Sequence, residues 1–250
     1  MIVSVCIEKG GTGKSQTAVN LSAALVKYCK QKVLVVDLDP QGTASLGFGI
    51  SPLSNNTHAI HEVLSGEIAP EDAVYAYNDS ELCIMPARHE LALYGSQEFT
   101  TEFDKLLRSM SSVFDFIFID LPPTLGNFTT TALSLSDAAL IPVNASSSVC
   151  IVALISQLRT IKTIVEEHIN DRLAVLGILA CMINNTRICT EVVTWMEEEY
   201  SDLMFQTKIR QNIKLAESLG LGVPIFDYSP DSYGALDYKS LALEIMGRIS

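Results

Sequence analysis

Apolar residues gather along this chain in short runs that are separated by longer amphipathic stretches. The apolar runs occupy 2–7, 33–36, 116–119, 138–143 and 176–180. Runs with so few polar residues are typical of strands that are buried on both faces of a parallel sheet. The stretches between them show helical periodicity, at 18–28, 99–110, 127–135, 149–168, 190–200 and 236–249. The pattern therefore predicts strands that alternate with helices.

This alternation predicts an α/β fold with a doubly wound, mostly parallel sheet and helices on both faces. We expect residues 1–250 to form a single domain, since this length suits one α/β unit with a substantial core. Residues 47–58, rich in Gly, Ser and Asn, predict a surface loop rather than a domain boundary. Ligands of such sheets bind beyond the carboxyl ends of the strands, so residues that follow the apolar runs are the first site candidates.

One strand-to-helix connection carries a glycine-rich phosphate loop. Residues 8–17 read Glu-Lys-Gly-Gly-Thr-Gly-Lys-Ser-Gln-Thr. Backbone N–H groups of such a loop wrap a phosphate chain, because its glycines allow φ > 0 and bring no Cβ near the anionic oxygens. Lys14 can reach the β- and γ-phosphates, and the Ser15 hydroxyl can ligate Mg²⁺. The predicted nucleotide-binding residues of this loop are Lys9, Gly10, Gly11, Thr12, Gly13, Lys14, Ser15 and Gln16.

Carboxylates follow two other apolar runs. The run at 33–36 leads into Asp37-Leu38-Asp39, and the run at 116–119 leads into Asp120. Together with the loop they point to one edge of the sheet, as in the fold of P-loop NTPases. Because Mg²⁺ prefers oxygen ligands, the predicted metal-site residues are Ser15, Asp39 and Asp120, the last acting through water. Asp37 is expected to support the metal shell or the loop after its strand.

The loop departs from the ordinary phosphate-loop pattern at Glu8, where that pattern has Gly, and it carries a second lysine, Lys9. This Lys-Gly-Gly-x-Gly-Lys-Ser sequence resembles the deviant phosphate loop of the ParA/MinD family of dimeric partition and positioning ATPases. The family's extra lysine touches phosphates bound by the other subunit, which implies that Lys9 links ATP binding to dimerisation. A carboxylate at Glu8 repels bound phosphates unless it points away.

The resemblance also assigns catalytic roles. In the family, the second Asp of an Asp-x-Asp-Pro-Gln motif positions the attacking water, which implies that role for Asp39. Lys9 and Lys14 would neutralise charge on the γ-phosphate. Pro122-Pro123 and Gly126 resemble the family's second switch, where the backbone can report the γ-phosphate. The predicted catalytic residues are thus Lys9, Lys14 and Asp39.

The resemblance extends to residues 207–238, which are similar to the family's C-terminal segment. The loop before Leu-Ala-Glu borders the adenine there, which implies adenine contacts for Arg210 and Asn212. Asn184 or Asn185 can reach the base edge through amide hydrogen bonds. Residues 144–152 depart from the chromosomal partition branch, because they lack its acidic residue, and their serines are closer to MinD.

Composition limits the kind of partner. The formal net charge of −12 argues against a protein that binds nucleic acid over most of its surface, but it leaves room for a local basic patch. No apolar run reaches about eighteen residues and the first begins at Ile2, so we expect a cytoplasmic protein without a membrane span or signal peptide. Six scattered cysteines are expected to be small buried residues.

The resemblance implies a slow, partner-stimulated ATPase that uses ATP and Mg²⁺. ATP would drive a sandwich homodimer that binds nucleoid DNA non-specifically, and hydrolysis, stimulated by a centromere-binding ParB-like adaptor, would return it to monomers. Binding of two subunits at once would double any basic patch. The candidate DNA contacts are Arg187, Lys208 and Lys214, joined by Arg210, Lys239 and Arg248. The end of the chain, 241–250, has one basic residue, so a membrane-surface helix is not expected.

Three alternatives stay open. A MinD-like positioning ATPase would act at a membrane or on a protein cargo. A metabolic or cluster-assembly ATPase could share the loop, with a metal cluster between subunits as in nitrogenase iron proteins, although the cysteines do not sit in that family's motifs. A non-catalytic scaffold gated by ATP would show no turnover, but Lys9, Lys14 and Asp39 are all present.

Overall fold

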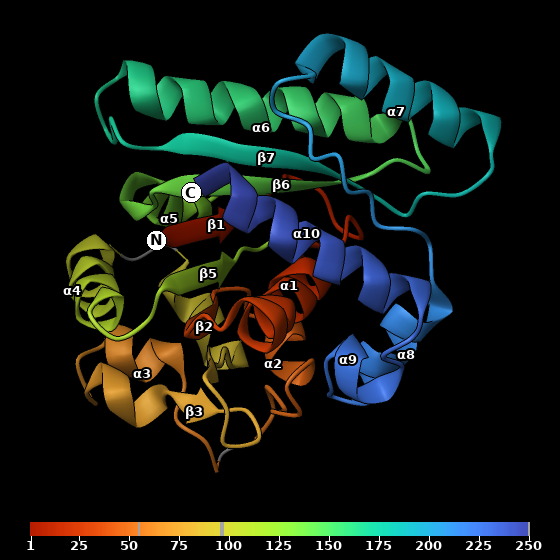
Figure 1. Ribbon diagram of the computed structural model, residues 1–250. Helices are drawn as coiled ribbons and strands as arrows, with labels where there is room; N and C mark the ends of the chain where they lie inside the picture. Colours follow the sequence, from red (N-terminus) through yellow and green to blue (C-terminus); the bar gives the residue numbers. More distant parts are fainter. Residues whose placement is uncertain (55, 96–97, 250) are drawn as a thin grey trace.

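A seven-stranded sheet forms the centre of the computed structural model, which describes residues 1–54, 56–95 and 98–249. Its strands are β1 (Ile2–Val5), β2 (Val33–Asp37), β3 (Tyr75–Ala76), β4 (Leu82–Met85), β5 (Phe116–Asp120), β6 (Ala138–Asn144) and β7 (Ala174–Cys181). Their order is β3-β4-β2-β5-β1-β6-β7. Neighbouring strands are parallel except β3 and β4. Figure 1 shows the sheet from β7 near the top to β3 near the bottom.

Helices connect the strands and cover both faces of the sheet. They are α1 (Lys14–Cys29), α2 (Thr43–Leu46), α3 (Ile60–Leu64), α4 (Thr100–Ser111), α5 (Asn127–Leu135), α6 (Val149–Glu166), α7 (Arg187–Tyr200), α8 (Ile213–Gly220), α9 (Ile225–Tyr228) and α10 (Tyr233–Ile249), with 3₁₀ turns η1 (Pro70–Ala73) and η2 (His89–Tyr94). One face carries α1, α8, α9 and α10, and the other carries α3 to α7. In Figure 1, α1 and α10 lie in front of the strands.

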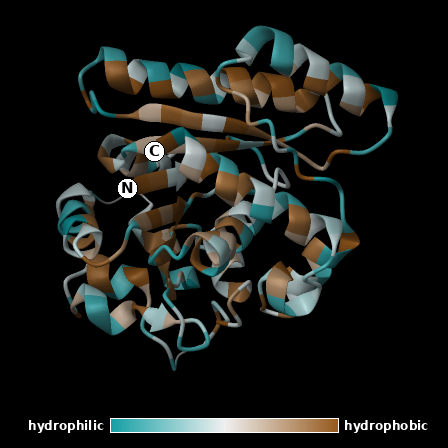
Figure 2. Cartoon of the chain, in the orientation of Figure 1, coloured by the Kyte–Doolittle hydropathy of each residue, from teal (hydrophilic) through white to brown (hydrophobic). Residues whose placement is uncertain are grey.

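Two hydrophobic cores result from the alternation of side chains along each strand. In β2, Leu34 and Val36 belong to the core beneath α3 to α7, whereas Val33 and Val35 belong to the core beneath α1 and α10. Figure 2 shows the strands as mostly hydrophobic. Burial on both faces explains why these runs lack polar residues, and the predicted fold class, a doubly wound and mostly parallel sheet with helices on both faces, is confirmed.

The shortest elements escaped the sequence pattern. β3 is only two residues long and gives no apolar run. β4, Leu-Cys-Ile-Met, is an apolar run of four residues that was not among the predicted strands. The described residues of 47–58 form no helix or strand, as expected for a loop. Among the residues that the structure describes, no helix is long and apolar enough to cross a membrane.

Strand register brings the predicted site residues to one edge. Asp120, the last residue of β5, pairs with Val5 at the end of β1 and with Asp37 at the end of β2. The connections that leave these strands therefore start side by side at the carboxyl edge of the sheet. β6 ends at the same edge in Asn144 and leads into α6.

Candidate active site

The phosphate loop turns from β1 into α1 through two left-handed glycines. Gly11 has φ +69°, and Gly13, the N-cap of α1, has φ +97°. Both values lie where a side chain would strain the backbone, so glycine is required there. Gly10 does not have a positive φ, and a Cβ built on it would meet no atom within 4 Å. Two of the three glycines thus use the positive φ that glycine allows.

Lys14 closes this loop on itself. Its ammonium donates to the carbonyl of Lys9 at 2.8 Å and to that of Ile7 at 3.3 Å. The side chain is 7% exposed, and this burial lowers its pKa, while nearby Asp120 and Asp39 oppose the shift. An ammonium that is held by neutral carbonyls in a buried site is poised to exchange them for phosphate oxygens, which bind a cation more strongly.

Asp37 and Asp39 organise the loop after β2 in different ways. One Asp37 oxygen accepts from the Ser45 N–H and hydroxyl, both at 2.7 Å, and the other accepts from the Asp39 N–H at 3.1 Å. Burial raises the pKa of Asp37 to about 7, and these hydrogen bonds partly offset the rise. Asp39 is 8% exposed and lines the cavity beside the phosphate loop. Asp37 thus holds the loop, and Asp39 faces the space where phosphates would lie.

Asp120 provides the test of a magnesium site. Its side chain is fully buried, yet neither carboxylate oxygen has a hydrogen-bond partner of good geometry among the described residues. Burial raises the pKa of Asp120 well above its usual value, and so does Asp37, whereas the Ser15 hydroxyl lowers it. A buried carboxylate without partners is costly unless a cation neutralises it. Asp120 and Ser15 therefore fit a hard cation such as Mg²⁺.

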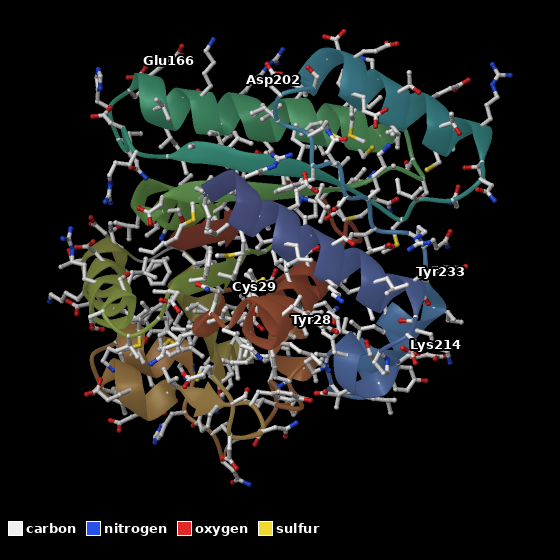
Figure 3. The ribbon with its side chains drawn as sticks, in the orientation of Figure 1. Tyr28, Cys29, Glu166, Asp202, Lys214 and Tyr233 are labelled. Atoms are coloured by element: carbon white, nitrogen blue, oxygen red, sulfur yellow. The ribbon has the colours of Figure 1, made fainter. Side chains whose placement is uncertain are left out.

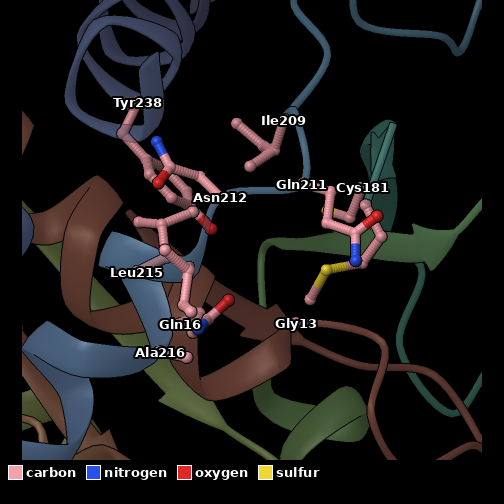
Figure 4. Close-up of a pocket in the computed structure, with 11 residues that line it drawn as sticks. Gly13, Gln16, Cys181, Ile209, Gln211, Asn212, Leu215, Ala216 and Tyr238 are labelled. Carbon is pink, nitrogen blue, oxygen red and sulfur yellow. The ribbon is translucent and has the colours of Figure 1, made fainter. Parts of the chain in front are cut away.

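Two adjoining cavities lie along the start of α1. One, of about 290 Å³, is lined by Gly10 to Gln16 together with Asp39, Thr43, Pro123, Met182 and Leu219. The other, of about 320 Å³, shares Gly13, Gln16 and Met182 with the first and continues between the 209–216 segment and α10. Figure 4 shows Tyr238, Asn212 and Leu215 on one side of this second cavity and Cys181 and Gln211 on the other. A polar phosphate cradle thus opens into a mostly apolar chamber of a size that suits a base.

The predicted adenine contacts divide into two groups. Asn212 lines the second cavity, although its side chain also caps α8 by accepting from the Lys214 N–H. Arg210 does not line it, because its guanidinium is paired with Asp237 and lies over the Tyr233 ring. Asn184 is also absent from the lining: its amide donates to Gln211, which does line the cavity, and its carbonyl accepts from Thr186.

Sequence reasoning missed several residues that shape the site. Gln211, Met182 and Tyr238 line the base-sized cavity, but they are ordinary core or loop types without a distinctive pattern. Asn144 donates from its side-chain amide to the Gly11 carbonyl at 3.1 Å and so braces the phosphate loop. A usable signal existed there, because Asn144 is a polar residue that directly follows the apolar run 138–143, as Asp120 follows its own.

Glu8 and Lys9, at the start of the phosphate loop, have different surroundings. The Glu8 carboxylate accepts hydrogen bonds from Ser156 and Thr160 of α6, so it points away from the phosphate cradle. The ammonium of Lys9 has no hydrogen bond or ion pair among the residues that the structure describes, and Lys9 lines neither cavity. Within one chain, the predicted catalytic lysines thus differ: Lys14 belongs to the cradle and Lys9 does not.

Among the residues that the structure describes, each candidate DNA contact except Lys239 has an acidic partner. Arg187 is 92% exposed and paired with Glu191 at 2.7 Å, Lys208 with Glu197 at 2.5 Å, and Lys214 with Glu217 at 2.8 Å. Arg248 is paired with Glu244, and Lys239 lies over the Tyr28 ring. Figure 3 shows Lys214 near Tyr233, on the side of the molecule where α8 and α10 begin. Exposed pairs of this kind are weak and can be exchanged for a stronger anion, but they leave little net positive charge.

Comparisons with known proteins cover nearly the whole chain. Residues 1–175 match a family described as an AAA domain. The sporulation initiation inhibitor protein Soj of Bacillus subtilis is 32% identical over 98% of this chain and 97% of its own. The septum site-determining protein MinD of Pyrococcus horikoshii, solved with Mg-ADP, has a TM-score of 0.81 at 25% identity, covering 100% of this chain and 97% of its own. Cobyrinic acid a,c-diamide synthase of Mycobacterium smegmatis, solved with ADP and magnesium, has a TM-score of 0.83 at 25% identity, covering 99% and 94%.

Proposed function

Since the chain belongs to the ParA/MinD family of partitioning and positioning ATPases, we propose that it is a partition ATPase whose Mg²⁺-ATP-bound form pairs with a second copy through Lys9. ATP is its substrate, and Mg²⁺ is its metal cofactor. The observation that best supports this proposal is the contrast between the two loop lysines. The Lys14 ammonium is bonded within the phosphate loop, whereas the Lys9 ammonium has no hydrogen-bond or ion-pair partner among the described residues. A cation that its own chain leaves unsatisfied is suited to the phosphates of a twin subunit.

The residues around the phosphate cradle have separate roles in the transfer of the γ-phosphoryl group to water. Backbone N–H groups of residues 10–15 hold the phosphates, and Lys14 neutralises the β- and γ-oxygens. Ser15 and Asp120 are the groups that would hold Mg²⁺, which would supply positive charge to offset that of the phosphates. Asp39 orients the attacking water and can accept its proton as the water oxygen bonds to the γ-phosphorus. The bond between the γ-phosphorus and the β–γ bridging oxygen breaks in the same step, and that oxygen leaves with ADP.

Exposed apolar side chains at the same edge of the sheet support pairing of two copies. Val149 and Val152, in the first turn of α6, are 61% and 70% exposed, and Leu125, in the connection after β5, is half exposed. Apolar residues that are exposed one turn of helix apart, as Val149 and Val152 are, are typical of interaction sites. Lys9 is close enough to this part of α6 to lower the pKa of Cys150, against the larger effect of burial, so exposed apolar side chains and a cation occur near each other where we propose that a second copy binds.

DNA binding and the ATP cycle complete the proposal. In the dimer, the basic residues of two chains act together, which steepens the dependence on salt and raises affinity for non-specific DNA. Hydrolysis then returns the protein to monomers, and a ParB-like adaptor that binds the centromere accelerates this slow step. A membrane is a poor fit for α10, because its cations Lys239 and Arg248 lie over the rings of Tyr28 and Phe205 rather than forming a basic face.

Sizing and turnover assays on the full chain test this function. We expect a monomer with ADP, a dimer with a non-hydrolysable ATP analogue, and slow Mg²⁺-dependent turnover that rises with DNA and an adaptor. ATP turnover that does not change with added DNA but depends on a small substrate would favour a metabolic ATPase instead. Absence of turnover would favour a scaffold, and co-sedimentation with liposomes would favour membrane positioning.

Asp120→Asn should raise the Mg²⁺ concentration needed for half-maximal turnover by about tenfold or more. The substitution keeps size and polarity but removes the buried charge that a divalent cation would neutralise. Titrating Mg²⁺ at fixed ATP measures the effect. Asp171→Asn, at an exposed carboxylate after α6, is the control and should leave the titration unchanged. An Asp120→Asn protein with the Mg²⁺ dependence of the unsubstituted protein would remove Asp120 from the metal site.

Arg187→Glu should abolish retention on DNA while ATP turnover stays intact. The substitution replaces a cation with an anion next to Glu191, so the local field would repel phosphates. Arg172→Glu is the matched control, because Arg172 is also exposed and paired, with Asp137, but lies before β7 at the opposite edge of the sheet. Retention in an electrophoretic shift assay at low salt is the measurement. Unchanged retention would exclude Arg187 from the basic patch.

A further inference from the structure

A carboxylate at the start of the phosphate loop is held by two hydroxyls of a distant helix. One Glu8 oxygen accepts from Ser156 at 3.0 Å and the other accepts from Thr160 at 3.2 Å. These hydroxyls lie one turn apart on α6, so a single carboxylate spans both of them. Among the described residues Glu8 forms no ion pair, although Lys9 and Lys14 are close in sequence. We call this arrangement of Glu8, Ser156 and Thr160 the clasp.

The clasp adds to other constraints on the next residue, Lys9. The Lys9 N–H donates to the Ile7 carbonyl at 2.7 Å, and the Lys9 carbonyl accepts from the Lys14 ammonium at 2.8 Å. Ile7 itself is buried in the core. Residue 9 is therefore fixed by both of its backbone polar groups and by the side chain before it. Its own ammonium, by contrast, has no partner among the described residues.

We propose that Glu8 is a positioning residue whose clasp on α6 fixes the backbone at residue 9, so that Lys9 is held ready for the phosphates of a second copy of this chain. This inference rests on the proposed function, because it assumes that Lys9 acts across a dimer. Fixing the backbone that carries Lys9 in advance lowers the entropy that is lost when the dimer forms, and so strengthens assembly. α6 also carries the exposed Val149 and Val152, so the clasp joins the phosphate loop to the helix that borders the partner.

The clasp matters most when nucleotide is bound. Phosphate oxygens compete for the Lys14 ammonium, because a charged acceptor binds it more strongly than a carbonyl does. As Lys14 turns to the phosphates, the Lys9 carbonyl loses that contact. The clasp is then the remaining side-chain restraint on this part of the loop, at the stage when Lys9 has to reach the other subunit.

Glu8 could instead act through its charge alone, and the chain allows the two roles to be separated. Glu8→Gln keeps the clasp, since its amide oxygen accepts from one hydroxyl and its NH₂ donates to the other, but it removes the charge. Glu8→Ala removes both. Ser156→Ala with Thr160→Val removes the hydroxyls and leaves the charge. Thr163→Val, at an exposed position of the same helix, is the matched control.

The experiment measures dimerisation with a non-hydrolysable ATP analogue by sedimentation, and ADP affinity of the monomer by calorimetry. We expect Glu8→Ala and the hydroxyl pair each to weaken dimerisation by about tenfold or more, with ADP affinity within about twofold of the unsubstituted protein. Glu8→Gln and Thr163→Val should dimerise normally. Combining Glu8→Ala with the hydroxyl pair should add no further loss, since all three substitutions break one interaction.

The outcomes of this experiment distinguish a failure of the clasp inference from a failure of the proposed function on which it rests. An unsubstituted protein that stays monomeric with the analogue overturns the proposed function, and the clasp inference with it. If the unsubstituted protein dimerises and Glu8→Ala dimerises equally well, the inference fails alone. It also fails if Glu8→Gln is as weak as Glu8→Ala, because charge rather than the clasp would then position Lys9. Retained ADP affinity shows in each case that the variant is folded.

Discussion

Asp39→Ala should reduce ATP turnover by at least about 100-fold while the ATP-bound dimer persists. Asp39 lines the cavity beside the phosphate loop, and only one of its oxygens accepts a hydrogen bond among the described residues, from the Gln41 N–H at 3.0 Å. Removing the carboxylate leaves the phosphate cradle and Lys9 in place but takes away the group that orients water. Sizing with ATP, with ADP and without nucleotide, next to a phosphate-release assay, measures both effects.

A second substitution separates this catalytic role from a structural one. Asp39→Asn keeps an oxygen that can accept from the Gln41 N–H, so the turn after β2 is preserved, but it is a far weaker base. We expect the Asp39→Asn variant to have as little ATP turnover as the Asp39→Ala variant. Normal turnover in the Asn variant would mean that Asp39 only shapes the turn. An Asp39→Ala protein that binds ATP but remains monomeric would remove the main support for its water-positioning role.

Lys9→Ala should abolish ATP-dependent dimerisation and lower turnover by about 1,000-fold, the scale of a cation supplied in trans to a phosphoryl-transfer site. ADP affinity should stay close to that of the unsubstituted protein, because Lys9 lines neither cavity of its own chain. Lys14→Ala should instead lose nucleotide binding itself, since Lys14 lies within the cradle. Lys32→Ala, remote from the carboxyl edge, is the charge-matched control.

Mixing two inactive variants tests whether Lys9 acts in trans. In a heterodimer of Lys9→Ala with Asp39→Ala, the Lys9→Ala subunit still has its own Asp39, and the other subunit can supply Lys9 to it. One complete site is thereby restored, so the mixture should regain turnover that neither variant shows alone. Recovery proportional to heterodimer content would support the trans arrangement. A mixture that stays inactive, although the two variants associate, would place the role of Lys9 within its own chain.

The strands and the phosphate loop could be predicted because local sequence dictates them. A run such as 116–119 has few stable placements other than a strand buried on both faces, and Gly11 and Gly13 adopt backbone angles that other residues resist. The base-sized cavity could not be predicted in the same way. Its lining comes from the phosphate loop, the end of β7, the segment before α8 and α10, and only packing brings these together. Arg210 illustrates the limit, because Asp237 occupies its guanidinium.

By itself, the sequence determined that this chain forms a parallel α/β sheet with a phosphate loop and that carboxylates follow the neighbouring strands, since each feature depends on residues close together in the chain. Only the tertiary structure decided where the side chains of that motif point. Glu8 could have faced the phosphates, and Lys208 could have lacked an acidic partner. Packing of α6 on the sheet gives Glu8 its two hydroxyls, and α7 gives Lys208 the carboxylate of Glu197. Such partners are chosen by geometry in three dimensions, because a side chain adopts the contact that lowers its free energy in the folded chain, whatever its distance along the sequence.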